Sequence, residues 1–271
     1  MVRIDPSQAV PFTVESLTAD LRALGVAPGS TLLVHSSMSS IGYVAGGAHA
    51  VVLALLDAVG PDGTLVVPTH SSDLSDPGHW VNPPVPDAWW PVIRAEAPAY
   101  DPDLTTTVGM GAVADTVRRV PGARRSAHPT DSMCAIGPDG EWITAHHALE
   151  DGLGDSSPLA RLYETGADVL LLGVGHANNT SLHLAEVRAG TQGTTPDGAP
   201  VLVDGERQWV PYEVVNVRTD DFTAVGAALG DAGIERLGTV GRATSRLLGV
   251  RPMVDFAQDW FATHRPGSLK S

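Results

Sequence analysis

The chain has 271 residues, 43% of them hydrophobic, and its acidic side chains outnumber the basic ones by 31 to 17. The formal charge of −14 argues against nucleic acid and membrane partners and favours cationic ones. The single cysteine, Cys134, excludes an internal disulfide and a zinc site made of several cysteines. No apolar run approaches the roughly 20 residues of a membrane span, and the N-terminus has no apolar signal core. We therefore expect a cytoplasmic protein.

The first 70 residues predict a βαβ unit. Residues 13–26 have the apolar spacing of a helix that ends at Gly25. A short buried strand is predicted at 31–35, a helix at 46–60 and a second strand at 63–70. Two strands joined by one helix over so short a stretch favour a parallel pair.

Residues 73–106 interrupt this alternation. The segment is rich in proline and contains three of the six tryptophans. Aromatic residues in this number argue against disorder. We expect a packed surface excursion rather than a linker.

The α/β alternation resumes after residue 106 and predicts one domain over residues 1–271. Its fold class is expected to be an αβα sandwich around a mainly parallel central sheet, with a smaller β-containing lobe at about 191–220. Asp204 and Gly205 are predicted to form the two-residue turn of a hairpin in that lobe. The expected elements are helices at 107–119, 141–150, 157–166 and 180–190, strands at 132–137 and 168–175, a hairpin over 200–214, and a C-terminal helical region ending at 254–264.

His183 and Glu186 lie three residues apart in the helix that follows the strand at 168–175. On a helix this spacing puts both side chains on one face. A carboxylate beside one imidazole nitrogen fixes the tautomer, and the other nitrogen can then take a proton. The spacing is equally compatible with an ordinary hydrogen-bonded pair on a helix. The position after a parallel strand favours a site, because open α/β sheets bind ligands at that edge.

Two glycine-containing loops are weak nucleotide signals. "HSSMSSIGYVAGG" at 35–47 offers hydroxyls and free amides at a helix start, which suits an anion. It has no lysine of the phosphate-binding loop, and it is equally compatible with a turn that needs small residues. "GVGHANN" at 173–179 has two of the three dinucleotide-binding glycines and no ribose-binding acid.

A cluster of arginines stands out on the acidic chain. Arg118, Arg119, Arg124 and Arg125 fall within eight positions. A local cationic patch suits a phosphate-bearing ligand, and a solvated edge of the fold is the alternative. Cys134 follows in an apolar strand, where a lone cysteine is usually core filler.

Six segments of the chain are informative when they are taken together and in order. They are "LLVHSSMSSIGYVAGG", "LLDAVGPDGTLVVPT", "DLSDPGHWVNPPVPDAWW", "RRSAHPTDSMCAIG", "GLGDSSPLARL" and "VLLLGVGHANNTSLHLAE". In this order they resemble the antibiotic N-acetyltransferase family, whose members include the aminoglycoside 3-N-acetyltransferases. The resemblance covers roughly residues 15–190 and weakens after that.

The resemblance implies metal-free transfer of an acetyl group from acetyl-coenzyme A to an amine. It assigns His183 and Glu186 to the catalytic base and Asp155 to an acid near the amine or the histidine. Direct transfer in a ternary complex is expected, with backbone amides at a loop or helix start stabilising the oxyanion. The residues implied on the coenzyme A side are Ser36, Ser37, Val44, Arg125 and Ser126, with His35 bordering the thioester.

The acceptor is expected to be a cationic small molecule of the aminoglycoside type, acetylated at its 3-N position. Family members commonly have an acidic residue just before the "NTSLH" run, where this chain has His176 and Ala177. A different, non-antibiotic amine is therefore the alternative acceptor. A non-catalytic binder of cationic antibiotic, a hydrolase, and a route through a Cys134 acyl-enzyme are further alternatives. Both a monomer and a homodimer fit the sequence.

Overall fold

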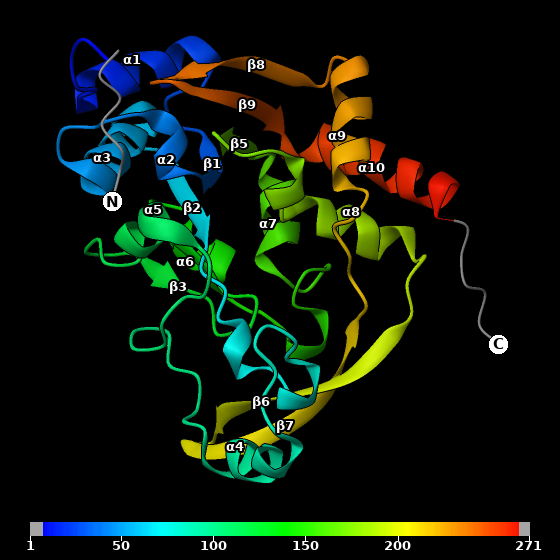
Figure 1. Ribbon diagram of the computed structural model, residues 1–271. Helices are drawn as coiled ribbons and strands as arrows, with labels where there is room; N and C mark the ends of the chain where they lie inside the picture. The colour runs from blue at the N-terminus through cyan, green and yellow to red at the C-terminus, as the bar shows by residue number, and fades with distance from the viewer. Residues whose placement is uncertain (1–7, 266–271) are drawn as a thin grey trace.

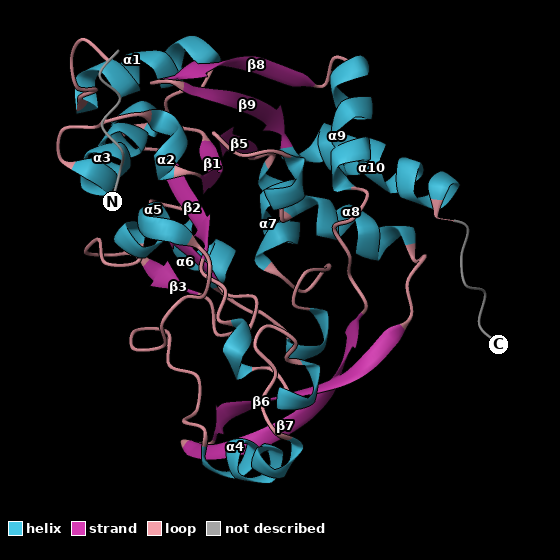
Figure 2. Ribbon diagram, in the orientation of Figure 1, coloured by secondary structure: helices cyan, strands magenta, loops and turns pink. Residues whose placement is uncertain are grey.

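The computed structural model describes residues 8–265, which form a sheet covered by helices on both faces and a smaller lobe beside it (Figures 1 and 2). The sheet has seven strands in the order β3-β4-β2-β1-β5-β9-β8. The bounds are β1 (Thr31–Ser36), β2 (Thr64–Pro68), β3 (Arg124–Arg125), β4 (Met133–Ile136), β5 (Asp168–Leu172), β8 (Glu235–Val240) and β9 (Ala243–Gly249).

The three central strands of this sheet are parallel. β1 pairs in parallel with β2 on one side and with β5 on the other. β4 and β9 flank this trio and are antiparallel to it, and the edge strands β3 and β8 are antiparallel to β4 and β9 in turn. Five of the seven strands therefore run in one direction, which agrees with the expected mainly parallel sheet. On each side of the parallel trio the two outer strands are consecutive in the chain and antiparallel, β3 with β4 and β8 with β9.

Alternate side chains of the central strands point to opposite faces of the sheet, and each face has its own hydrophobic core. Leu32 and Val34 of β1 face one core and Leu33 faces the other, because successive side chains of a strand point to opposite faces. The first face is covered by α1 (Val14–Leu24), α3 (Gly47–Val59) and α5 (Gly111–Val117). The second face is covered by α6 (Gly140–Thr144), α7 (Pro158–Thr165), α8 (Ser181–Ala189), α9 (Phe222–Asp231) and α10 (Val250–His264). The predicted αβα sandwich is confirmed.

The smaller lobe consists of the β6–β7 hairpin and the excursion that packs on it (Figure 1). β6 (Thr194–Val203) and β7 (Glu206–Val215) pair over ten residues. Asp204 and Gly205 both have positive φ, as a type I′ turn requires. The excursion includes α4 (Trp90–Glu96), and Arg207 of β7 donates a 3.0 Å hydrogen bond to the Ala97 carbonyl. The segment is ordered against the hairpin, as its aromatic content predicts.

Three parts of the chain differ from the predicted elements. The helix predicted at 141–150 is the short α6, and the chain then turns through a 3-10 helix at Leu149–Asp151. The region before the last helix contains the β8–β9 hairpin rather than helix alone, and its turn includes Gly241 with positive φ. α2 (Met38–Ile41), α4 and β3 were not predicted as separate elements, whereas α9 lies in the C-terminal region that was predicted to be helical.

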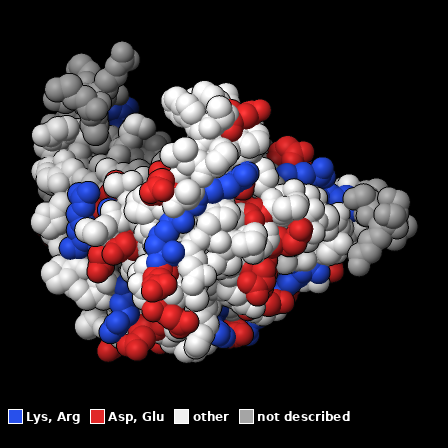
Figure 3. Space-filling view, turned by 90° about the horizontal axis from the view of Figure 1, so that it is seen from below, with Lys and Arg blue, Asp and Glu red and all other residues white. Residues whose placement is uncertain are grey.

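Charge is not gathered in one place on the face that Figure 3 shows, where acidic and basic side chains are interspersed. No helix within residues 8–265 is both long and apolar enough to cross a membrane.

Gly137, which follows β4, packs closely against the backbone of Gly63 just before β2. Its φ is +131°, and an added Cβ would lie 2.4 Å from the carbonyl oxygen of Gly63. Gly122 also has a positive φ, of +88°, but an added Cβ there meets nothing within 4 Å. We expect Gly122→Ala to lower the free energy of unfolding by about 1–2 kcal/mol, from backbone strain. Gly137→Ala should lower it by about 1–3 kcal/mol more, from overpacking. Urea denaturation measures both, and equal losses would contradict the packing argument.

Candidate active site

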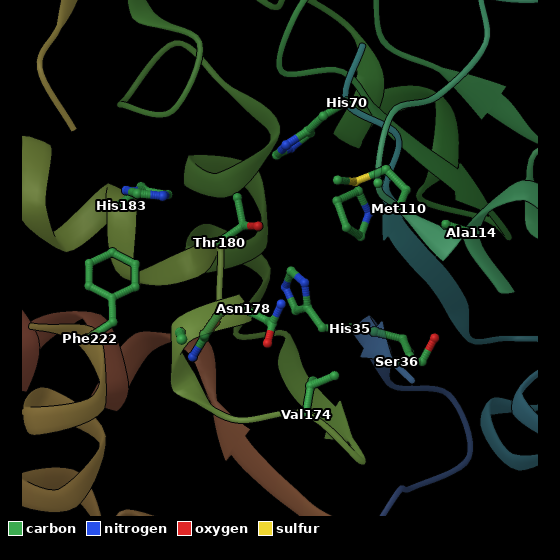
Figure 4. A pocket seen from close by; sticks show the side chains of 15 residues that line it. His35, Ser36, His70, Met110, Ala114, Val174, Asn178, Thr180, His183 and Phe222 are labelled. Atoms are coloured by element: carbon green, nitrogen blue, oxygen red, sulfur yellow. The ribbon is translucent and has the colours of Figure 1, made fainter. Parts of the chain in front are cut away.

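Three adjacent parallel strands each bring one histidine to the same edge of the sheet. His35 lies near the end of β1, His70 follows the end of β2, and His183 lies in the first turn of α8, which follows β5. Because carboxyl ends of parallel strands meet at one edge, the three side chains line one pocket of about 230 Å³ (Figure 4). The other lining residues are Val34, Ser36, Pro68, Gly109, Met110, Ala114, Val174, Ala177, Asn178, Asn179, Thr180 and Phe222.

His183 and Glu186 form the expected pair. The Nδ1 atom of His183 lies 2.8 Å from Oε2 of Glu186, and the ring packs against Phe222 with centroids 4.8 Å apart. With Nδ1–H donating to the carboxylate, Nε2 carries a lone pair that can accept a proton. The pair therefore has the arrangement of a general base with an orienting carboxylate.

Glu186 is fully buried, and several donors compensate its charge. Oε1 accepts a hydrogen bond from the backbone N–H of Arg218 at 3.0 Å and one from Nε2 of Gln192 at 3.2 Å. The guanidinium of Arg265, itself 4% exposed, makes a buried ion pair with the same oxygen. Arg265 also binds Asp221, with Nε donating to Oδ2 at 2.6 Å. Burial opposes ionisation of Asp221, but Arg265 outweighs it and holds the pKa of Asp221 below its usual value.

His35 and His70 are kept neutral by their surroundings. Burial lowers the pKa of His35 to about 3, assisted by the charges of His70 and His183. Burial also lowers the pKa of His70, which the negative charge of Asp131 opposes. The Nε2 atoms of both rings are buried without a hydrogen-bond partner. His70 was missed in the sequence, although a histidine directly after a strand parallel to β1 is a signal that could have found it.

The predicted residues of the β1–α2 loop have different surroundings. Ser36 lines the pocket. Ser37 lies beside it and is hydrogen-bonded to neighbouring hydroxyls, at 3.0 Å to Ser39. Val44 is 5% exposed and belongs to the core under α3 rather than to the pocket lining. Their assignment to coenzyme A stays a prediction.

Arg125 is held inside the protein. Its Nε donates to Ser132 at 3.0 Å, and both terminal nitrogens donate to oxygens of the chain, including the Thr69 carbonyl at 2.6 Å. Ser126 is buried and pairs with Nδ1 of His147 at 2.9 Å. Arg124 forms an ion pair with Glu141 at 3.2 Å. The geometry gives these residues internal partners, and the arginine cluster does not converge on the pocket.

Two further predicted positions, Asp155 and His176, are not among the residues that line the histidine pocket, and the role of Asp155 stays a prediction. Asp155 accepts a 2.9 Å hydrogen bond from Nε of Arg188, and it is not among the pocket-lining residues. His176 is buried with its Nε2 3.0 Å from Glu235, so its ring faces α9 and the sheet edge, while Ala177 lines the pocket.

A hollow rich in acidic side chains lies between the smaller lobe and the sheet domain. Its volume is about 200 Å³. Its Asp131 is close enough to the histidine pocket for its negative charge to raise the pKa of His70 against the effect of burial. The excursion contributes Ser75 to the wall, but none of its tryptophans. The lining residues are Ser72, Ser75, Thr130, Asp131, Glu150, Asp151, Gly152, Leu153, Val187, Asp197, Val214, Val215 and Val217.

A second hollow, of about 420 Å³, carries two arginines and shares Val174 with the histidine pocket. Arg242 lies in the β8–β9 turn and Arg246 in β9, where its Nε is 3.4 Å from Glu235. These arginines were not identified as candidate site residues from the sequence, because the β8–β9 hairpin that carries them was not predicted. The other lining residues are Ser40, Gly173, Gly175, Ala243 and Thr244.

A family model described as aminoglycoside 3-N-acetyltransferase matches residues 33–262. The chain belongs to this family. It is accordingly an acyltransferase, and the predicted family membership is confirmed. The match extends well past residue 190, so it includes α9, the β8–β9 hairpin and most of α10.

Individual members of the aminoglycoside 3-N-acetyltransferase family agree with this assignment over nearly whole chains. The chain is 44% identical to the SPbeta prophage-derived aminoglycoside N(3')-acetyltransferase-like protein YokD of Bacillus subtilis (strain 168), over 100% of both chains. It is 40% identical to aminoglycoside N(3)-acetyltransferase VII of Streptomyces paromomycinus, over 92% of this chain and 91% of that one.

Two solved structures show the same fold. The crystal structure of YokD superposes with a TM-score of 0.94 and covers 97% of this chain and 98% of its own. The structure of AAC-IIIb in a binary complex with CoASH superposes with a TM-score of 0.84 at 31% identity, over 97% of this chain and 100% of that one.

Arg265 should be essential for stability because it compensates a fully buried carboxylate. Removing one partner of a buried ion pair costs about 3–5 kcal/mol, and we expect Arg265→Ala to lower the free energy of unfolding by this amount. Arg124→Ala is the control, since its pair with Glu141 is exposed and such pairs contribute about 0–1 kcal/mol. If urea denaturation gave the same loss of unfolding free energy for both variants, Arg265 would not be needed to compensate the buried charge of Glu186.

His35 should make the protein less stable in mild acid. Its pKa is about 3 when folded and 6.5 as the ordinary value, so between these pH values the unfolded chain binds a proton that the folded chain does not. Stability must then fall as the pH decreases below about 6.5. In His35→Gln, the plot of unfolding free energy against pH between 6 and 4 should be shallower by about 1 kcal/mol per pH unit. Parallel plots for variant and wild type would contradict the assignment.

Proposed function

We propose that the protein transfers the acetyl group of acetyl-coenzyme A to an amine of an aminoglycoside-type acceptor, at its 3-N position. The observation that carries this proposal is the His183–Glu186 pair at the pocket where three parallel strands end. Membership in the aminoglycoside 3-N-acetyltransferase family supports the reaction class and the acceptor.

In the proposed mechanism His183 is the general base. An ammonium group has no lone pair for attack on a thioester, so the amine must lose a proton. Nε2 of His183 accepts that proton, and the buried carboxylate of Glu186 stabilises the imidazolium that forms. Phe222 packs against the ring and keeps it from rotating out of line.

The two hollows beside the pocket have charges suited to the two substrates of the proposed reaction. Coenzyme A is polyanionic, and the hollow with Arg242 and Arg246 offers positive charge next to Val174 of the pocket. The acceptor is polycationic, and the hollow with Asp131, Glu150, Asp151 and Asp197 offers negative charge. We propose that the two substrates bind together, one from each side, and that the amine attacks the thioester directly.

A route through an acyl-enzyme has less support. Cys134 is 1% exposed within the core of the first face. Burial raises the pKa of its thiol to about 12, which disfavours the thiolate that a nucleophile requires. A non-catalytic binder would need no buried carboxylate to orient His183, so that alternative is also less favoured. A non-antibiotic amine remains the alternative acceptor, since Ala177 lines the pocket where relatives commonly have an acid.

His183→Gln should lower kcat about 10²–10⁴-fold, the usual contribution of a general base. Gln keeps a polar side chain but cannot accept the proton, so KM for acetyl-coenzyme A should change little. Thiol release from acetyl-coenzyme A, assayed with a panel of aminoglycosides and other polyamines, measures the rate. Proton NMR of the product locates the new acetyl group.

Cys134→Ser is the control for the same assay and should retain the wild-type rate. Initial-velocity plots should intersect, as a ternary complex requires, whereas parallel plots would indicate an acyl-enzyme. Wild-type turnover in His183→Gln would exclude the proposed base. Amine binding without thiol release for every acceptor would favour a binder.

A further inference from the structure

Two side-chain nitrogens in the histidine pocket lack the partners that buried polar atoms normally have. Among residues 8–265, nine buried side-chain nitrogen and oxygen atoms have no hydrogen-bond partner. Only Nε2 of His35 and Nε2 of His70 belong to residues that line the pocket. Buried polar groups in proteins are almost always paired, and an exception calls for an explanation such as a role in catalysis.

The two rings lie across the pocket from the proposed base. Figure 4 shows His183 beside Phe222 on one side, with the side chains of His35 and His70 reaching into the space from the other. The charge of His183 acts on both rings. A group bound between the three imidazoles would therefore have the base on one side and two unpaired nitrogens on the other.

We propose that the Nε2–H groups of His35 and His70 donate hydrogen bonds to the carbonyl oxygen of the acetyl thioester and stabilise the oxyanion that forms from it. This inference rests on the proposed acetyl transfer. The two imidazoles would take the role expected of backbone amides, and both would be catalytic residues in addition to the His183–Glu186 pair.

The step needs no further reactant. The ammonium proton taken by His183 first passes to solvent, which leaves a neutral amine and a neutral imidazole. The amine nitrogen then forms a bond to the carbonyl carbon, the π electron pair moves to the oxygen, and His183 takes the second proton from nitrogen. The oxyanion then reforms the carbonyl, the carbon–sulfur bond breaks, and the thiolate leaves with the electron pair and receives the proton from His183. His35 and His70 donate hydrogen bonds throughout and neither gain nor lose a proton.

A neutral donor suits this position. Burial lowers the pKa of both histidines, so each ring presents an N–H without carrying a charge near neutral pH. A cationic donor would repel the imidazolium that forms at His183 and would oppose proton transfer to it. The nearby Asn179 is less suited, because its amide is already used in a 3.1 Å contact with the sulfur of Met253.

Matched Gln and Asn variants distinguish a histidine that donates a hydrogen bond through Nε2 from one that only fills space with a polar side chain. The amide nitrogen of Gln occupies the place of Nε2, whereas the amide of Asn is one bond shorter and reaches only the place of Nδ1. We expect His70→Asn to lower kcat about 10²–10³-fold, as removal of one oxyanion donor does. His70→Gln should retain most of the wild-type kcat. The same pair at His35 should behave alike, and affinity for coenzyme A, which has no acetyl carbonyl, should be unchanged.

The direct readout is the infrared carbonyl band of acetyl-coenzyme A labelled with ¹³C at the acetyl carbonyl, bound to each variant without acceptor. Hydrogen bonds lower this frequency, so the band should shift upward in the two Asn variants and stay near the wild-type position in the two Gln variants. His176→Gln is the control, because that ring is buried but lies outside the pocket lining, and its band should not move.

An unshifted band in both Asn variants, or wild-type kcat in both, would overturn the inference. The proposed function would still stand in that case if the wild type acetylates an amine. Failure of the wild-type protein to bind acetyl-coenzyme A would instead overturn the proposed function and the inference with it.

Discussion

The buried carboxylate of Glu186 is the group on which the site most depends. A charge without solvent contact must be surrounded by donors, and here they come from His183 of the same helix, from Gln192, from the backbone of Arg218 after β7, and from Arg265 at the end of α10. These donors span more than 80 positions of the chain. One carboxylate thus ties the last helix and the segment after the hairpin to the helix that carries the proposed base, and it fixes the orientation of the imidazole.

The proposed reaction also requires two substrates of opposite charge to reach one thioester. A uniformly acidic surface would attract the amine and repel coenzyme A. The structure separates the charges into an acidic hollow against the hairpin lobe and a hollow with two arginines at the β8–β9 hairpin. The histidine pocket shares Val174 with the second hollow, and the uncharged imidazoles of His35 and His70 do not oppose the formation of an imidazolium at His183.

Several residues that the family resemblance connects with ligands also have structural partners, and their assignment to ligands stays a prediction. Arg125 donates to chain oxygens from the excursion, from the segment after β2 and from Ser132, and it thereby joins the smaller lobe to the sheet. Asp155 accepts a hydrogen bond from Arg188 near the C-terminal end of α8. A family motif shows which residues occur together in the sequence. It does not show whether a residue of the motif contacts the substrate or belongs to a buried hydrogen-bond network that supports the site.

The sequence by itself determined the αβα sandwich, the βαβ unit at its centre, the ordered excursion and the hairpin turn at Asp204, because periodicity and turn chemistry act over a few neighbouring residues. It also determined the His183–Glu186 pair, since spacing along one helix turn sets that contact. The family resemblance already implied that His35 borders the thioester. Only the tertiary structure decided that His70 joins His35 and His183 in one pocket, since strand order and direction bring these positions together. The same holds for Arg265, Arg242 and Arg246, which contribute through hairpin pairing and helix packing over distances along the chain that local patterns do not encode.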